Sequence, residues 1–276
     1  MKPPRLFGNL GHGEREYFLS FARTHEREIA LHENPGGLWE KDVNGNDWSN
    51  VTEHCLIEAA RVDMLARLLG FSDRIREYLT SAAAVHDFNK KEDIRRTHED
   101  IAAGGSGRKG NLITEEESEK ILRAAGFSDI VVSLAGCVSG DPKDVYRMKN
   151  ILDLADPSPE DIAHLVMHYV DNYTRGSMWA EPSEKRGGQA LNDIDRRNEM
   201  NTSNSAYKKI DREGLVLNEG HPFFDGMTRF EAAAALSHLI EKRLSGIMRV
   251  RGIDVRDPLD IPEFVDARIK ENISKK

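Results

Sequence analysis

Apolar residues recur along much of this chain every three or four positions, a spacing that gathers them on one face of an α-helix. The clearest run follows Asn50 and has an apolar residue at every fourth position, namely Leu56, Ala60, Met64 and Leu68. Asn50 and Glu53 have the reciprocal spacing of a capping box, which marks the start of this helix. Strand signals are scarce throughout, so the pattern predicts an all-α fold.

Short motifs predict where further helices begin. The tetrapeptide GFSD occurs at 70–73 and again at 126–129, each time between two helical patterns. Its Gly can take a left-handed conformation after a helix end, and its Ser can cap the next helix. Other helix starts are expected at Thr114, Ser158 and Thr228, and near Pro262. The helix that begins at Ser158 is expected to end at Gly176.

Polarity divides the chain into four stretches. Residues 1–50 are expected to form an N-terminal extension, with a peripheral helix within 13–32, that packs on the core. Residues 51–180 are the predicted helical core. Between 181 and 227 the composition is polar and irregular, which predicts a long loop or lid. Residues 228–276 return to a helical pattern and are expected to belong to the same domain.

Length and charge narrow the classes of function. With 276 residues, the chain can bury a sizeable core as one large domain or as a core domain with additions. The net charge of -8 disfavours binding to a long nucleic acid, whose phosphates call for a basic surface. A small phosphorylated ligand needs only a local positive site. One candidate cluster for this role consists of Lys90, Lys91, Arg95 and Arg96.

The sequence also indicates a cellular environment. It contains no membrane span, and the N-terminal residues lack the apolar stretch of a secretory signal. Cys55 and Cys137 are too few for a disulfide framework, so a reducing cytoplasm fits best. A homodimer is compatible with these features.

Four residues that bind divalent metals well recur along the chain in a fixed order, each within a predicted helix: His54, His86, Asp87 and Asp171. Imidazole nitrogens and carboxylate oxygens together suit Zn, Mn, Fe, Co or Ni, and a site that leaves room for water can generate hydroxide near neutral pH. Asp171 shares one helix face with three other polar residues, His164, His168 and Arg175. Taken alone, that face also fits a solvated polar stripe.

The strings around these residues are VTEHCLIEAARV, SAAAVHDFNKK and HLVMHYVDNYTRG. They resemble the three motifs of the HD-domain metal-dependent phosphohydrolases, and the resemblance spans roughly residues 50–176. It implies an HD-domain-like helical bundle and one divalent metal ion, of the kind Mn, Co, Ni, Zn, Fe or Mg. Its protein ligands would be His54, His86, Asp87 and Asp171, with water completing the shell.

The resemblance further implies a class of substrate and the residues that act on it. A nucleotide or another small phosphoester would bind through its phosphate, and a metal-bound water would attack phosphorus. Asp87 and Lys90 would be the catalytic residues, since Lys90 matches the lysine of the HDxxK variant and would neutralise phosphate charge. Arg175 would contact the phosphate similarly. The alternative interpretation of Lys90 is a solvated surface lysine without a role in catalysis.

Some HD subfamilies hold a second metal with two more histidines between the His-Asp pair and the last Asp. This interval contains His98, His164 and His168, with Cys137 where one such ligand would be sought, so one metal ion is expected. Two alternative functions stay open. One is a di-iron oxygenase on a related helical scaffold, and the other is a nucleotide-binding module without turnover.

Overall fold

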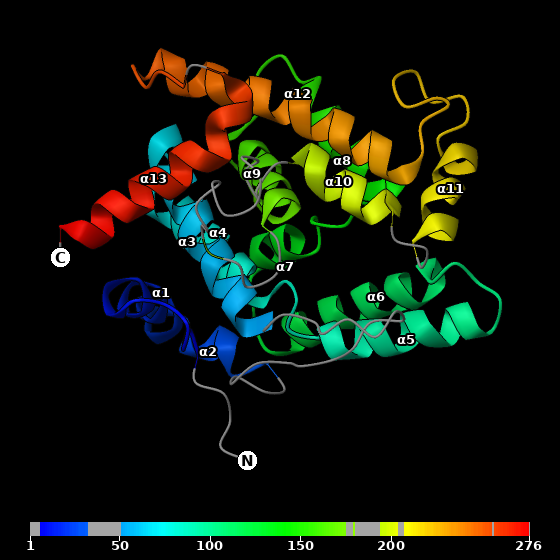
Figure 1. The fold of residues 1–276 in the computed structure, drawn as a ribbon, viewed down its shortest axis with the longest axis horizontal. Helices are drawn as coiled ribbons and strands as arrows, with labels where there is room; N and C mark the ends of the chain where they lie inside the picture. Colours follow the sequence, from blue (N-terminus) through cyan, green and yellow to red (C-terminus); the bar gives the residue numbers. More distant parts are fainter. Residues whose placement is uncertain are drawn as a thin grey trace.

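The structure is a computed structural model that describes residues 6–32, 51–174, 179, 194–203, 207–255 and 257–275. Within these ranges every regular element is a helix and no strand is present (Figure 1). The predicted all-α class is therefore confirmed. None of the helices in the described ranges is both long and apolar enough to cross a lipid bilayer.

A pair of antiparallel helices, α3 (Val51–Leu69) and α4 (Asp73–Val85), lies at the centre of the fold (Figure 1). Nearly every residue of α3 is buried, which identifies it as a helix surrounded by others rather than one with a single apolar face. Its neighbours include α1 (His12–Thr24), α9 (Pro159–Tyr173) and α13 (Ile261–Ser274). These contacts fix α3 as the element around which the core is built.

The turn between α3 and α4 is the first GFSD tetrapeptide. Gly70 has a φ of 74°, a left-handed conformation, and Ser72 caps α4 by accepting a hydrogen bond from the amide of Ile75. In the second copy Gly126 is also left-handed, with a φ of 80°, and Ser128 precedes α7 (Asp129–Ala135). The prediction of one turn used twice is confirmed for both glycines and, as a side-chain cap, for Ser72.

The remaining helices surround this centre. A hairpin of α5 (Lys90–Ala102) and α6 (Arg108–Ala124) packs along one side, and the long α12 (Arg229–Val250) spans another (Figure 1). The smaller helices that complete the layers are α2 (Glu26–Ile29), α8 (Pro142–Leu152), α10 (Ile194–Ser203), α11 (Lys208–Leu217) and the 3-10 helix η2 (Pro258–Asp260).

Two predicted helix starts are confirmed by reciprocal capping. The Ser158 hydroxyl accepts from the amide of Asp161, whose carboxylate accepts in turn from the Ser158 amide. Thr228 and Glu231 make the same exchange at the start of α12. Such boxes satisfy amide groups that have no partner within the helix, so they localise a helix start well.

Three other sequence predictions are corrected by the structure. Thr114 does not begin a helix, because α6 already starts at Arg108 and the Thr114 hydroxyl bonds to the carbonyl of Gly110 within it. The peripheral helix expected within 13–32 is divided into α1 and α2, since His25 has non-helical dihedral angles. The helix from Ser158 ends at Tyr173, and Gly176 lies outside the described residues.

The stretch 181–227, predicted as a long loop or lid, contains α10 and α11 in its described part. Packing explains the difference: α11 buries Ile210 and contacts α12 closely at Gly214. A Cβ atom at Gly214 would overlap the backbone of Arg229, so the absence of a side chain permits this approach.

A fully buried ion pair joins α13 to the core. The guanidinium of Arg61 donates to both carboxylate oxygens of Asp266, at 2.9 and 2.8 Å, and to the hydroxyl of Thr174 at 3.0 Å. Neither Arg61 nor Asp266 is exposed by more than 5%. This bidentate pair therefore links α3, the end of α9 and the last helix.

We expect Asp266→Ala to lower the free energy of unfolding by about 3–5 kcal/mol, because it leaves a buried guanidinium without its carboxylate. Urea denaturation followed by circular dichroism measures the change. Glu271→Ala, which removes a surface pair with Arg268 on the same helix, is the matched control and should change stability little. A loss below about 1 kcal/mol for Asp266→Ala would contradict the role given to this pair.

Candidate metal centre

Side chains from α3, the end of α4 and α9 converge at one place in the core. His54 and Glu58 lie one turn apart on α3, so both project from the same face. His86 directly follows the last residue of α4, and Asp171 lies near the end of α9. These four residues are the donor cluster discussed below.

The distances within the donor cluster are short and similar to one another. His54 Nε2 lies 3.2 Å from His86 Nε2 and 3.4 Å from Asp171 Oδ1, while His86 Nε2 lies 3.6 Å from the same oxygen. Glu58 Oε2 is 3.5 Å from His54 Nε2 and 3.3 Å from His86 Nε2. One ligand atom from each residue falls within 4.8 Å of all the others.

This arrangement fits a metal ion. Ligand atoms that bind one ion at about 2.1 Å in tetrahedral geometry lie about 3.4 Å from one another. The observed separations scatter around that value, and the donors are two imidazoles and two carboxylates, which suit several divalent transition metals. In the part of the chain that the structure describes, it is the one group of three or more such donors.

The orientation of His86 suits a ligand. Its Nδ1–H donates to the carbonyl of Ala83 at 3.0 Å, which directs Nε2 into the donor cluster. Burial alone would lower the pKa of His86, but the negative charges of Glu58 and Asp87 and a hydrogen bond with Asp171 outweigh it and raise that pKa well above its usual range. A field that attracts a proton this strongly also attracts a cation.

Asp87 lies beside the donor cluster rather than within it. Its Oδ2 is 3.8 Å from His86 Nε2 and 4.0 Å from His54 Nε2, and its Oδ1 is 3.5 Å from Lys90 Nζ. Burial tends to raise the pKa of Asp87, but Lys90 and the two histidines lower it overall, so the carboxylate stays ionised. Asp87 thus lies between the donor cluster and the ammonium group of Lys90.

The surroundings of Lys90 could be predicted only in part from the sequence. The helix of His86 does not continue, because α4 ends at Val85 and α5 begins at Lys90 after a short turn. Lys90 Nζ lies between Asp87 and Asp93, 3.3 Å from Asp93 Oδ2, and these carboxylates raise its pKa against the effect of burial. Asn111 of α6 donates to Asp93 at 2.6 Å. The ammonium group is therefore held in place and charged.

The structure brings three of the four predicted metal ligands together and places the fourth, Asp87, beside them. His54, His86 and Asp171 lie together, and Asp87 and Lys90 lie at the edge of the cluster. Arg175 lies outside the described residues.

Glu58 was missed. Its spacing of four residues from His54 places both on one helix face, but only its full burial shows that this carboxylate faces the core.

The basic cluster expected to attract phosphate is mostly neutralised. Arg95 pairs with Glu92 and Glu99, and Arg96 pairs with Glu92 and Glu117. Of that cluster, Lys90 is the member placed next to the donor cluster by the distances above. The glycine-rich stretch 104–111 is helical from Arg108 onwards.

Three residues considered for a second metal have other partners. His168 Nδ1 lies 2.7 Å from the carbonyl of Cys137, and His164 bonds to Ser133 and to the carbonyl of Glu160. The Cys137 thiol donates to the carbonyl of Leu134. The bonds of His164 to Ser133 and of His168 to Cys137 join α9 to α7 and to the residues just after α7.

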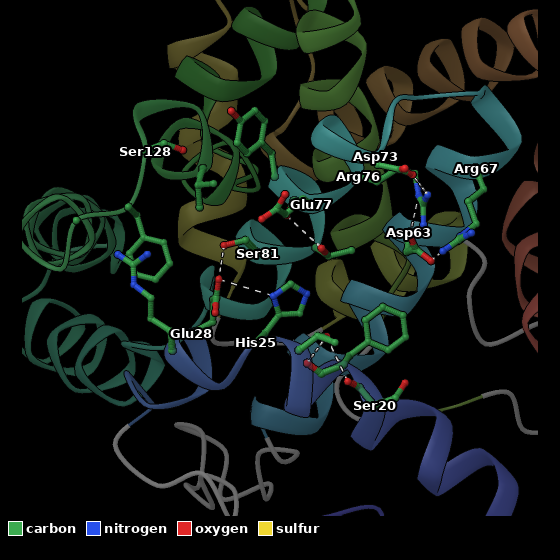
Figure 2. A pocket seen from close by; sticks show the side chains of 18 residues that line it. Ser20, His25, Glu28, Asp63, Arg67, Asp73, Arg76, Glu77, Ser81 and Ser128 are labelled. Atoms are coloured by element: carbon green, nitrogen blue, oxygen red, sulfur yellow. Dashed lines mark hydrogen bonds and ion pairs between the residues drawn. The ribbon is translucent and has the colours of Figure 1, made fainter.

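Away from the donor cluster, a hollow of about 760 Å³ lies near the turn between α3 and α4 (Figure 2). Its charged side chains bind one another: Asp63 pairs with Arg67 and Arg76, and Glu28 accepts from Ser81 (Figure 2). Self-paired charges are typical of a structural surface. We therefore place the candidate site at the donor cluster.

No protein-family model matches the chain, and neither a curated protein nor a solved structure shows significant similarity to it. A function is therefore inferred from the donor cluster and from the sequence motifs that supply it.

We expect cation binding to release protons and to strengthen as the pH rises. Below the raised pKa of His86 the imidazole holds a proton, which must leave before Nε2 can bind a cation. The dissociation constant for Mn²⁺ should therefore fall with increasing pH through the neutral range. Calorimetry in two buffers of different ionisation enthalpy measures the released protons, and equal heats would contradict the expectation. His98→Ala, on α5, is the control and should release as many protons as the parent protein.

Proposed function

We propose that this chain is a metal-dependent phosphohydrolase that acts on a nucleotide or another small phosphoester. The observation that carries the proposal is the convergence of two imidazoles and two carboxylates beside a fixed ammonium group. The resemblance of the three motifs to HD-domain phosphohydrolases supports the same function. It supplied His54, His86 and Asp171, three of the four residues in the donor cluster.

Each part of the site has a role on this proposal. A bound divalent ion would polarise the phosphate and provide hydroxide near neutral pH. Lys90, held between Asp87 and Asp93, offers a positive charge to a phosphate oxygen at the edge of the cluster. Asp87 is ionised, so its Oδ2 can accept a proton from an attacking water.

The charge of the whole chain supports a small substrate. A net charge of -8 repels a long polyanion, whereas one fixed ammonium group beside a buried cluster suffices for a single phosphate. The di-iron oxygenase alternative, by contrast, assigns no role to Lys90. That alternative and the nucleotide-binding module without turnover are outcomes of the experiment below.

We expect the protein, loaded with Mn²⁺, Co²⁺, Mg²⁺ or Ni²⁺, to release phosphate from one or more members of a nucleotide and phosphoester panel. His86→Ala should lose bound metal and activity together, because it removes a donor from the cluster centre. Elemental analysis and phosphate release measure the two. His98→Ala is the matched control and should retain both. Two irons per chain would favour the oxygenase, and nucleotide binding without turnover across the metals would favour the binding module.

We expect Lys90→Ala to lower kcat/KM by roughly 10- to 100-fold, mainly through KM, because one charged hydrogen bond to phosphate is lost. Bound metal should be unchanged, since the ammonium group is not a donor to a cation. The exposed neighbour Lys91, changed to Ala, is the control. An unchanged KM for Lys90→Ala would contradict the phosphate-binding role and would mean that Lys90 only pairs with Asp87 and Asp93.

A further inference from the structure

We propose that Glu58 is a direct metal ligand, and that its carboxylate makes the donor cluster favour an oxygen-preferring divalent ion such as Mn²⁺ relative to Zn²⁺. This inference rests on the metal site of the proposed function. It adds a residue that the motif comparison did not include and names the chemical class of the cation.

Glu58 lies as close to the two imidazoles as Asp171 does. Glu58 Oε2 lies 3.5 and 3.3 Å from the Nε2 atoms of His54 and His86, and Asp171 Oδ1 lies 3.4 and 3.6 Å from the same two atoms. An ion that binds both imidazoles and Asp171 is therefore also within bonding reach of Glu58. The corresponding distances from Asp87 Oδ2 are longer, at 4.0 and 3.8 Å.

Burial distinguishes the carboxylates by their position in the site. The side chain of Glu58 is 0% exposed, whereas those of Asp171 and Asp87 are 14% and 21% exposed. Glu58 thus lies at the closed end of the cluster, and the two aspartates lie nearer to solvent. Positions for water and substrate are therefore expected on the side of the aspartates.

The carboxylates in and beside the donor cluster outnumber the positive charges of the protein there. Glu58, Asp171, Asp87 and Asp93 bring four negative charges, and Lys90 brings one positive charge. A divalent ion would bring two more positive charges, and buried charges are stable when they are compensated locally. A fully buried carboxylate such as that of Glu58 is costly without a positive charge close by.

The set of donors would account for such a preference. Zn²⁺ is satisfied by three protein ligands and a water, and His54, His86 and Asp171 would remain available without Glu58. Mn²⁺ favours carboxylate and water oxygens and takes more ligands, so it would depend more on the second carboxylate of the donor cluster. Zn²⁺ binds most sites more tightly in absolute terms, and the inference therefore concerns the change in relative affinity.

The experiment compares Glu58→Gln with the parent protein by competition titration of Mn²⁺ and Zn²⁺. We expect the dissociation constant for Mn²⁺ to rise at least tenfold and that for Zn²⁺ to rise clearly less. The visible absorption of bound Co²⁺ should also change, because a ligand atom is altered. Glu28→Gln is the matched control, since Glu28 is a buried glutamate bonded to Ser81 in the hollow of Figure 2, and it should leave all three readouts unchanged.

The outcomes separate this inference from the proposed function. Unchanged Mn²⁺ affinity and Co²⁺ absorption in Glu58→Gln would overturn the inference while the metal site stands. Equal losses for both metals would overturn the preference for Mn²⁺. Failure of the parent protein to bind any of these metals would instead refute the proposed function. If Glu58→Gln does not fold, Glu58→Asp replaces it in the experiment, because Asp keeps the charge but its shorter side chain moves the carboxylate away from the donor cluster. A tenfold weaker affinity for Mn²⁺ would support the inference, and an unchanged affinity would overturn it.

Discussion

Buried charge along α3 is the constraint on which the rest of the structure depends. Four ionisable side chains lie buried on one stretch of this helix, namely His54, Glu58, Arg61 and Asp63. Each has a partner on another helix, because a buried charge is costly unless it is compensated. The first two face α4 and α9, Arg61 binds Asp266 of α13, and Asp63 binds Arg76 of α4. These pairings specify which helices surround α3.

The same constraint makes the donor cluster rigid. Arg61 lies one turn beyond Glu58 and donates to Thr174, which directly follows the last residue of α9. Asp171 is carried by that last turn, so the ion pair that holds α13 also fixes the end of the helix that supplies a carboxylate. A site held by helices and by buried pairs keeps its donors within a narrow range of positions, which metal binding requires.

Much of the fold could be predicted from the sequence, because periodicity and capping are local properties. Ser158 and Thr228 marked helix starts correctly, whereas Thr114 has the same spacing to an acid but lies inside a helix that began earlier. Local spacing does not report such an earlier start. In the site, His54, His86 and Asp171 followed from a motif order. Glu58 did not, because an acidic residue on a helix is expected at the surface until its burial is known.

The position of Lys90 shows how the proposed substrate would compete with the protein itself. The ammonium group already contacts Asp87 and Asp93, so a phosphate oxygen must share it with these carboxylates. Asn111 holds Asp93, and the donor cluster lies beside Asp87, so both acids stay in place, and the three N–H donors of Lys90 leave room for a phosphate oxygen as a further partner. A group with more charge than a carboxylate competes best for it. This favours a terminal phosphate, which carries up to two negative charges, over a phosphodiester with one.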